Sequence, residues 1–465
     1  MRIREILKAT SPGPAFLAGL TLLMLGSCNS RYLDGMIVAV ELFGHEITCE
    51  GARLIAIDPD RPGKPAKVIS EGFTSACAPD ISPAGRYLLF QGKRQENDPW
   101  QIWAMDLEKK KTKQVTDMEA DCTDPAFLPD GQVVFSMESN MMGRKVSHLH
   151  VCHRDGCCLK KLTYHPAVDR ASTVLKEGRI LYLSSRQVPE RGKTVFFVMR
   201  PNGTKSEVYH YGVPGKVPLT GGAESEDGFV YFIEGDSEGE GWGKPVRLDH
   251  KRPLHSRDEL GSGGQFLSVL PDGSGSCLVS YREQKGETFA LHRYDTGSEK
   301  IGEPVYRGEG HVFDPVLIVP EKRPRILPND VNLGASTALL MSQDINHSMM
   351  PVQPGLSGDS LADRIRISGM EGELGKVKVK EDGSFYLKID ADMPFRIETL
   401  NSRGEVVRGP SDWIWLRPGT RRGCVGCHAD PELAPENRVP MAVTGPPAVV
   451  SKHNNAMNQL QSSEP

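Results

Sequence analysis

Short apolar runs separated by glycine- and aspartate-rich turns fill most of the chain, and they predict β-strands rather than helices. One unit, a turn followed by an apolar run, recurs along the first two thirds of the sequence. Its clearest copies are Ile81–Phe90, Phe127–Phe135 and Val174–Tyr182, and Glu226–Phe232 and Leu270–Tyr281 are weaker copies. The turn glycines lie 45 to 50 residues apart, at Gly85, Gly131, Gly178, Gly228 and Gly273.

A period of about 45 residues with several short strands in each repeat is typical of a β-propeller. The copies resemble the TolB-type propeller repeat, and we assign residues 28–325 to this domain. Asp314-Pro315 looks like the start of one more, truncated repeat. A strand from about residues 36–57 would complete that blade and close the ring. We expect six blades, with seven as the alternative.

After Pro324 and Pro328 the pattern changes to strict alternation of apolar and polar residues, which is typical of half-buried strands. The alternating segments are Arg364–Ile367, Lys376–Val379, Phe385–Ile389, Pro394–Leu400 and Trp413–Leu416. They predict a small β-sandwich-like domain over residues 326–450. Residues 451–465 are polar and are expected to be disordered. The predicted fold class is therefore all-β.

The first residues predict export. Three basic side chains precede an apolar run at Phe16–Leu25, and small residues then precede Cys28. This is the pattern of a secretory signal peptide, and it resembles the bacterial lipobox, in which the cysteine is lipidated. We expect residues 1–27 to be removed and Cys28 to anchor the protein to a membrane, facing the periplasm. Asn29 after the cysteine favours the outer membrane. An ordinary signal peptide cut nearby is the alternative.

Composition narrows the function classes. The 465 residues carry a formal net charge of −4, which argues against a general nucleic-acid-binding protein. The ten cysteines need an explanation. Cys77 and Cys122 occupy similar positions in adjacent repeats. They could form a structural disulfide, remain as two buried thiols, or lie as a pair near the central channel. Cys152, Cys157 and Cys158 surround a hairpin turn, where a local disulfide is favoured over a zinc site with His153.

The segment Cys424-Val425-Gly426-Cys427-His428 has the sequence of a c-type haem attachment site. Cys424 and Cys427 can each add to a haem vinyl group, and His428 is then placed to bind the iron. Half of a zinc site or a thiol redox pair are the competing interpretations. The first lacks a second cysteine pair nearby, and the second normally follows a βαβ pattern that this chain does not offer. The sequence therefore predicts one covalent haem c.

The second axial ligand is left open by the sequence. His311, His347 and Met441 are the candidates, and an open or water-filled position is the remaining alternative. Basic residues that surround the motif could pair with haem propionates, or they could form a solvated turn: Arg417, Arg421 and Arg422.

The C-terminal motifs, together with the propeller repeat, resemble the hydrazine synthase alpha-subunit family. The resemblance is carried by Asp382–Tyr386, Pro394–Arg396, Trp413–Gly419, the haem motif and Pro435–Pro440. It implies an N-terminal propeller joined to a middle domain with a c-type haem. In hydrazine synthase a tyrosine four residues after the motif histidine binds the iron, whereas this chain has Glu432 at that position. The synthase subunit also has a further haem domain, whereas this chain has one Cys-x-x-Cys-His motif. The resemblance thus implies the scaffold with one ordinary haem, without hydrazine synthesis itself.

Three hypotheses follow. The first is a lipid-anchored monohaem cytochrome that exchanges electrons with a periplasmic redox protein, with the propeller as a docking platform. The second is a redox enzyme that acts on a small substrate, nitrogen-containing or other, at an open haem face. The third is a propeller that binds a protein or cell-envelope ligand while the haem is structural or sensory.

Overall fold

The computed structural model describes residues 33–451, with gaps at residues 45, 62, 187–193, 262, 274, 357–359 and 427–437. The described part is built from strands, with one short 3-10 helix, η1 (Met441–Thr444). Within it, no helix is long and apolar enough to cross a membrane. The predicted signal peptide, Cys28 and all but the first residue of the polar tail lie outside the described residues.

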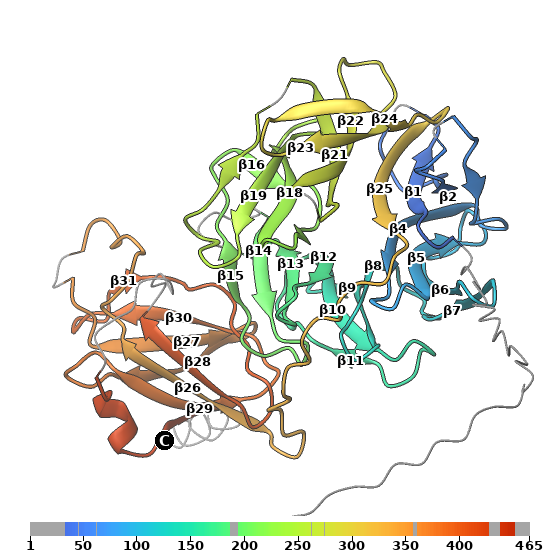
Figure 1. The fold of residues 1–465 in the computed structure, drawn as a ribbon. Helices are drawn as coiled ribbons and strands as arrows, with labels where there is room; N and C mark the ends of the chain where they lie inside the picture. The colour runs from blue at the N-terminus through green and yellow to red at the C-terminus, as the bar shows by residue number, and fades with distance from the viewer. Residues whose placement is uncertain are drawn as a thin grey trace, which may run out of the picture.

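Six sheets form a ring in the first domain (Figure 1). Four of them are meanders of four consecutive antiparallel strands. Their strands are β4 (Ser75–Ile81), β5 (Tyr87–Lys93), β6 (Gln101–Asp106) and β7 (Lys111–Gln114); β8 (Cys122–Phe127), β9 (Val133–Met141), β10 (Arg144–Cys152) and β11 (Lys160–Lys161); β12 (Asp169–Val174), β13 (Ile180–Ser184), β14 (Val195–Met199) and β15 (Glu207–His210); and β21 (Gln265–Pro271), β22 (Ser276–Arg282), β23 (Ala290–Asp295) and β24 (Lys300–Tyr306).

A fifth sheet has five strands: β16 (Lys216–Pro218), β17 (Ala223–Glu224), β18 (Phe229–Asp236), β19 (Lys244–Asp249) and β20 (Asp258–Glu259). The sixth joins both ends of the domain, in the order β25 (His311–Leu317), β1 (Ile37–Leu42), β2 (Arg53–Ile57) and β3 (Lys67–Val68). Strands β1 and β25 are antiparallel, with Val40 opposite Phe313. The ring is therefore closed by the N-terminal strand, as the sequence predicts, and it has six blades.

The second domain is a sandwich of two four-stranded sheets. One has the order β32 (Arg421–Gly426), β26 (Thr337–Asp344), β29 (Phe385–Asp390) and β33 (Ala448–Val450). The other has the order β28 (Gly372–Lys378), β27 (Arg364–Gly369), β30 (Phe395–Leu400) and β31 (Val406–Arg408). Apolar residues from both sheets form one buried cluster, which includes Leu340 and Leu387 of the first and Ile365 and Ile397 of the second.

One predicted strand is wrong. Trp413–Leu416 forms no regular strand, and only a single bridge joins Ile414 to Phe395. The segment instead crosses between the two domains. Trp415 is 4% exposed and belongs to a buried cluster of propeller residues that includes Tyr182 and Phe197. The two tryptophans of this segment do point in different directions, as the alternation predicts. They contact different parts of the protein, however, and do not lie on the two faces of a sheet.

The connection between the domains lies along the propeller. The Glu321 amide donates to the Pro83 carbonyl, and the Arg325 amide donates to the Lys176 carbonyl. The chain thus contacts the turns of two blades before it enters the sandwich. The sandwich then lies beside the blade of β12–β15 (Figure 1).

Candidate functional site

Cys424 lies on β32, an edge strand of the sandwich. This strand runs parallel to β26, with Cys424 opposite Ser342. Its thiol is free and half-buried. The sequence places the cysteine correctly after the sandwich strands, but it does not predict that the haem motif itself begins as a strand, because the partner in a parallel pair is far away in the sequence.

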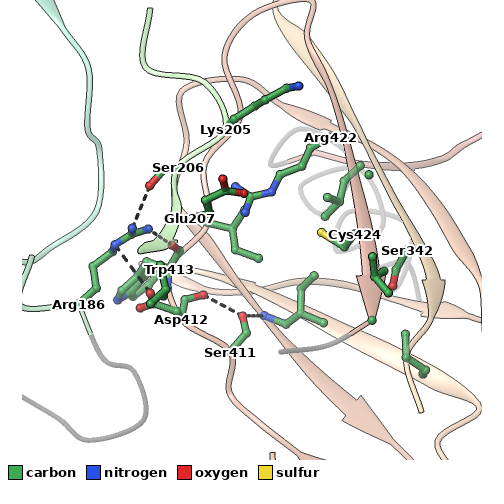
Figure 2. Close-up of a pocket in the computed structure, with 18 of the residues that line it drawn as sticks. Arg186, Lys205, Ser206, Glu207, Ser342, Ser411, Asp412, Trp413, Arg422 and Cys424 are labelled. Atoms are coloured by element: carbon green, nitrogen blue, oxygen red, sulfur yellow. Dashed lines mark hydrogen bonds and ion pairs between the residues drawn. The ribbon is translucent and has the colours of Figure 1, made fainter. Parts of the chain in front are cut away.

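The Cys424 side chain lines a pocket of about 460 Å³ between the two domains. Ligand pockets in proteins commonly have about 300–1,000 Å³. The sandwich contributes the apolar wall, with Leu340, Ile345, Phe385, Ile397 and Val425. The propeller contributes the opposite wall, with Arg186, Phe197, Lys205–Val208 and Tyr211. Figure 2 shows the Cys424 sulfur directed into this space.

Arg186 fastens the propeller side of the pocket to the sandwich. Its guanidinium donates to the Trp413 carbonyl at 3.2 Å and to the Ser206 hydroxyl at 2.9 Å, as Figure 2 shows. It also lies 3.7 Å from Asp412 Oδ2 and 3.6 Å from the centre of the Phe197 ring. Burial raises the pKa of Asp412, and the charge of Arg186 opposes that rise. A buried cation thus holds the segment that forms one rim of the pocket.

A second buried pair near Arg186 consists of His165 and Asp169. His165 Nε2 is 2.9 Å from Asp169 Oδ2, and both side chains are fully buried. Burial by itself would raise the pKa of Asp169, but the charges of His165 and Arg186 hold it below its usual value. The His165 ring lies 5.2 Å from the Trp415 ring. Charged groups of the propeller therefore meet the sandwich segment at its most buried point.

Arg421 and Arg422 also line the pocket, and Arg422 is drawn toward it in Figure 2. Within the described part of the chain neither guanidinium has a hydrogen-bond or ion-pair partner. Arg417, the third predicted propionate partner, is engaged elsewhere. It donates to the Tyr164 hydroxyl, to the Lys161 carbonyl at 3.3 Å and to Asp392 Oδ1 at 3.0 Å. In this structure Arg417 thus joins the two domains, and its role as a propionate partner stays a prediction.

His347 lies next to the haem motif. A Cβ atom on Gly426 would lie 2.1 Å from the His347 carbonyl oxygen and 3.1 Å from its ring Cδ2. Only glycine fits between the cysteines at this point, because any side chain would collide with that backbone. The His347 side chain is exposed. Cys427 and His428 themselves lie outside the described residues, as does Glu432.

Met441 approaches the same corner of the sandwich from the other side. Its amide donates to Asp382 Oδ2 at 2.8 Å, and Arg438 donates to the Gln343 carbonyl at 3.1 Å. Gln343 precedes Asp344, which pairs with Gly426. His347 therefore lies at the end of β32, whereas Met441 bonds to Asp382 before β29, two strands away in the sheet.

Comparisons with known proteins match this arrangement. Residues 350–429 match the family model described as the hydrazine synthase alpha subunit middle domain. Hydrazine synthase subunit alpha of Kuenenia stuttgartiensis is 19% identical, over 82% of this chain and 62% of that protein. The solved structure of Kuenenia stuttgartiensis hydrazine synthase superposes with a TM-score of 0.76 at 17% identity, over 89% of this chain and 73% of the other.

The chain is thus similar to the hydrazine synthase alpha subunit, with the match to the family model confined to residues 350–429. The predicted resemblance is thus confirmed, at low sequence identity. The chain spans less than two thirds of the length of the curated relative. TolB from Acinetobacter baumannii also matches, with a TM-score of 0.46 and 15% identity, over 61% of this chain and 67% of the other.

One predicted haem ligand, His311, lies in another part of the fold. His311 begins the ring-closing strand β25 and is buried. Its Nδ1 accepts from the Phe289 amide at 3.1 Å, and its Nε2 lies 3.1 Å from the Gly44 carbonyl. Both ring nitrogens are thus used inside the propeller. His311 therefore forms hydrogen bonds inside the propeller, on the strand that closes the ring, and its role as an iron ligand stays an untested prediction.

The cysteines of the propeller also require a correction. Cys77 forms a disulfide with Cys49, which the sequence analysis did not pair with it, and Cys122 is a free, buried thiol. Cys152, Cys157 and Cys158 are free thiols and form no local disulfide in this structure. Burial raises the pKa of Cys122 to about 12 and that of Cys152 to about 11. These two thiols therefore behave as small apolar residues and not as nucleophiles.

The residues at the pocket fit a haem. The apolar side chains suit the haem macrocycle. The cations suited to bind its propionates are Arg421, Arg422 and Lys205. Cys424 supplies a thiol at the wall of the pocket. The side chains that sequence reasoning missed are Arg186 and Asp412. Neither stands in a recognisable motif, because they meet only when the propeller and the sandwich are packed together.

Proposed function

We propose that this chain is an exported, lipid-anchored c-type cytochrome that holds one covalent haem in the pocket between its domains. The observation that carries the proposal is the place of Cys424, whose thiol lines a pocket of about 460 Å³ that combines apolar side chains with the cations Arg421 and Arg422. A bound haem would supply a one-electron redox centre.

In this proposal Cys424 and Cys427 hold the haem through thioether bonds, and His428 is an iron ligand. Arg421 and Arg422 would bind the propionates, since their guanidinium groups lie at the pocket without a partner among the described residues. His347 is the favoured second ligand because its backbone touches Gly426. Met441 is the alternative, since its amide bonds to Asp382 in the same sheet, two strands from β32.

Export is supported by two independent features. The N-terminal sequence has the pattern of a lipoprotein signal with Cys28 as the lipidated residue. The Cys49–Cys77 disulfide fits an oxidising compartment such as the periplasm. We propose a lipid anchor in the outer membrane, with both domains facing the periplasm and a soluble redox protein as electron partner.

A second function is favoured by the polar wall of the pocket. Arg186, Lys205 and Glu207 face the sandwich side, so a small polar substrate could be bound opposite the haem. The protein would then be a haem-dependent redox enzyme instead of an electron carrier. An enzyme needs an iron position that exogenous ligands can reach, whereas a carrier with two protein ligands does not.

The test uses the full chain, exported in a host that attaches c-type haem. The reduced-minus-oxidised spectrum should show the α band of haem c, and the Cys424→Ala/Cys427→Ala variant should lose it. Absence of the band in the wild type would contradict the proposal. Carbon monoxide then separates the two functions: an unchanged ferrous spectrum supports the carrier, and formation of a carbonyl complex supports the enzyme.

For the second ligand the informative variant is His347→Ala. If His347 binds the iron, the ferrous wild type resists carbon monoxide and the variant binds it. Met441→Ala serves as the matched comparison, because this residue lies at the same corner. A carbonyl complex in Met441→Ala alone would transfer the assignment to Met441.

A further inference from the structure

The turn between β10 and β11 carries a group of three soft ligands that the haem site does not use. The His153 ring and the thiols of Cys157 and Cys158 lie with their ligand atoms within 4.8 Å of one another. The two sulfur atoms are 3.2 Å apart. At metal–ligand bonds of about 2.0–2.3 Å, the ligands of one ion lie about 3.5–4 Å apart, so small side-chain rotations bring all three to one centre.

The backbone of the turn holds the ligands in place. The His153 amide donates to the Cys157 carbonyl at 3.0 Å, and the Gly156 amide donates back to the His153 carbonyl at 2.8 Å. Asp155 Oδ1 accepts from the Cys157 amide at 3.1 Å. These bonds fix the relative positions of the histidine and the first cysteine before any ligand binds.

The turn is also pressed against the neighbouring blade. A Cβ atom on Gly156 would lie 2.4 Å from the Val115 carbonyl oxygen. The Arg154 guanidinium lies 3.5 Å from the centre of the Tyr87 ring. The turn is therefore supported by a second sheet, which lowers the entropy lost when a ligand is bound.

Exposure sets these two cysteines apart from the other free thiols. Cys122, Cys152 and Cys277 are buried, as is usual for free cysteine, and Cys424 lines the haem pocket. Cys157 and Cys158 are exposed, together with His153. Their sulfur atoms fill no apolar core, so packing does not account for two adjacent thiols at this place.

We infer that His153, Cys157 and Cys158 form a binding site for a soft monovalent metal ion, Cu(I). Thiolate ligands select Cu(I) and Zn²⁺ over harder ions. Structural zinc sites have four protein ligands, whereas this group offers three within the described residues. A two-sulfur, one-nitrogen set suits the low coordination number of Cu(I). The charged neighbours of the two thiols in the sequence are Arg154, Asp155 and Lys160, which together carry one positive charge.

The test is an anaerobic titration of the full, haem-loaded protein with Cu(I) in the presence of a reductant and a competing chromogenic Cu(I) chelator. We expect one Cu(I) for each chain. His153→Gln, Cys157→Ser and Cys158→Ser should each weaken binding by roughly 100-fold or more, since even partners outside the ligand sphere contribute about 10–100-fold to metal affinity. Leu159→Ala is the matched control, because it changes an exposed side chain of the same turn and no ligand.

The reductant keeps both thiols free, so a disulfide between them cannot hide the site. Copper analysis counts the bound ion separately from haem iron. Absence of Cu(I) binding in the wild type, or binding that His153→Gln leaves unchanged, would overturn the inference. Stronger retention of Zn²⁺ than of Cu(I) in a parallel titration would overturn the choice of metal. The haem spectrum should be the same in all four variants.

Discussion

The propeller and the sandwich are both made of strands, but the strands of the two domains pair differently. Four propeller blades consist of consecutive antiparallel strands. In the sandwich sheet that carries Cys424, both edge strands are parallel to neighbours from distant parts of the sequence, with Leu339 opposite Arg421 and Leu387 opposite Ala448. Most propeller contacts are therefore local in sequence, whereas the strand with the haem cysteine pairs with a distant strand.

This difference places the chemistry at the boundary of the domains. The propeller buries its free thiols Cys122, Cys152 and Cys277, and burial raises the pKa of Cys277 to about 12. The sandwich instead presents Cys424 to a pocket whose opposite wall belongs to the propeller. The surroundings of Cys424 therefore depend on the contact between the domains, and the side chains that join the domains should control the pocket.

The largest effect is expected for Trp415→Ala. This side chain is buried in the propeller cluster although it belongs to the sandwich segment. Loss of a buried tryptophan costs about 3–5 kcal/mol. Urea denaturation should show that loss, while Trp413→Ala, at a half-buried position, should cost less. Equal losses of stability in Trp415→Ala and Trp413→Ala would contradict the larger role given to Trp415 in joining the domains.

A somewhat smaller effect is expected for Arg186→Met. It leaves Asp412 buried without its cation, and breaking a buried pair costs about 3–5 kcal/mol. The loss should be close to 3 kcal/mol, because the raised pKa of Asp412 lets that carboxyl take up a proton instead. Urea denaturation of Arg186→Met/Asp412→Asn should show partial recovery. A double variant less stable than Arg186→Met would contradict the pairing.

Gly426→Ala probes the edge strand alone. The new methyl group would meet the His347 carbonyl at 2.1 Å, and overpacking of this kind costs about 1–3 kcal/mol. We expect a lower yield of haem-loaded protein with an unchanged propeller. Gly445→Ala is the control, because a Cβ atom there has no neighbour within 4 Å. The haem-to-protein absorbance ratio measures the difference between the two variants. Equal ratios would show that the contact between Gly426 and His347 does not affect haem loading.

A further effect concerns pH and the propeller. Burial raises the pKa of Asp80 to about 7, with a further contribution from Glu321. The folded state therefore holds this proton more tightly than the unfolded chain does, so stability should fall as the pH rises from about 4 to about 7. Asp80→Asn should flatten that slope in urea denaturation. A slope unchanged in the variant would assign the titration to another group.

Much of the fold could be predicted because the propeller repeats are local. Glycine turns and apolar runs identify consecutive hairpins, and the closing pair of β1 and β25 follows from the incomplete last repeat. The parallel pairing of β32 could not be predicted, since alternation does not identify a distant partner. His347 was a candidate from its residue type, but its contact with Gly426 is a result of folding.

The central claim is that Cys424 and Cys427 hold one haem at the pocket between the domains. Trypsin cleavage after Arg422 and Arg438 would release a peptide that contains both cysteines and His428. Mass spectrometry of this peptide from the exported wild-type protein should show the added mass of one haem. A peptide with two unmodified thiols, or with a Cys424–Cys427 disulfide, would contradict the account.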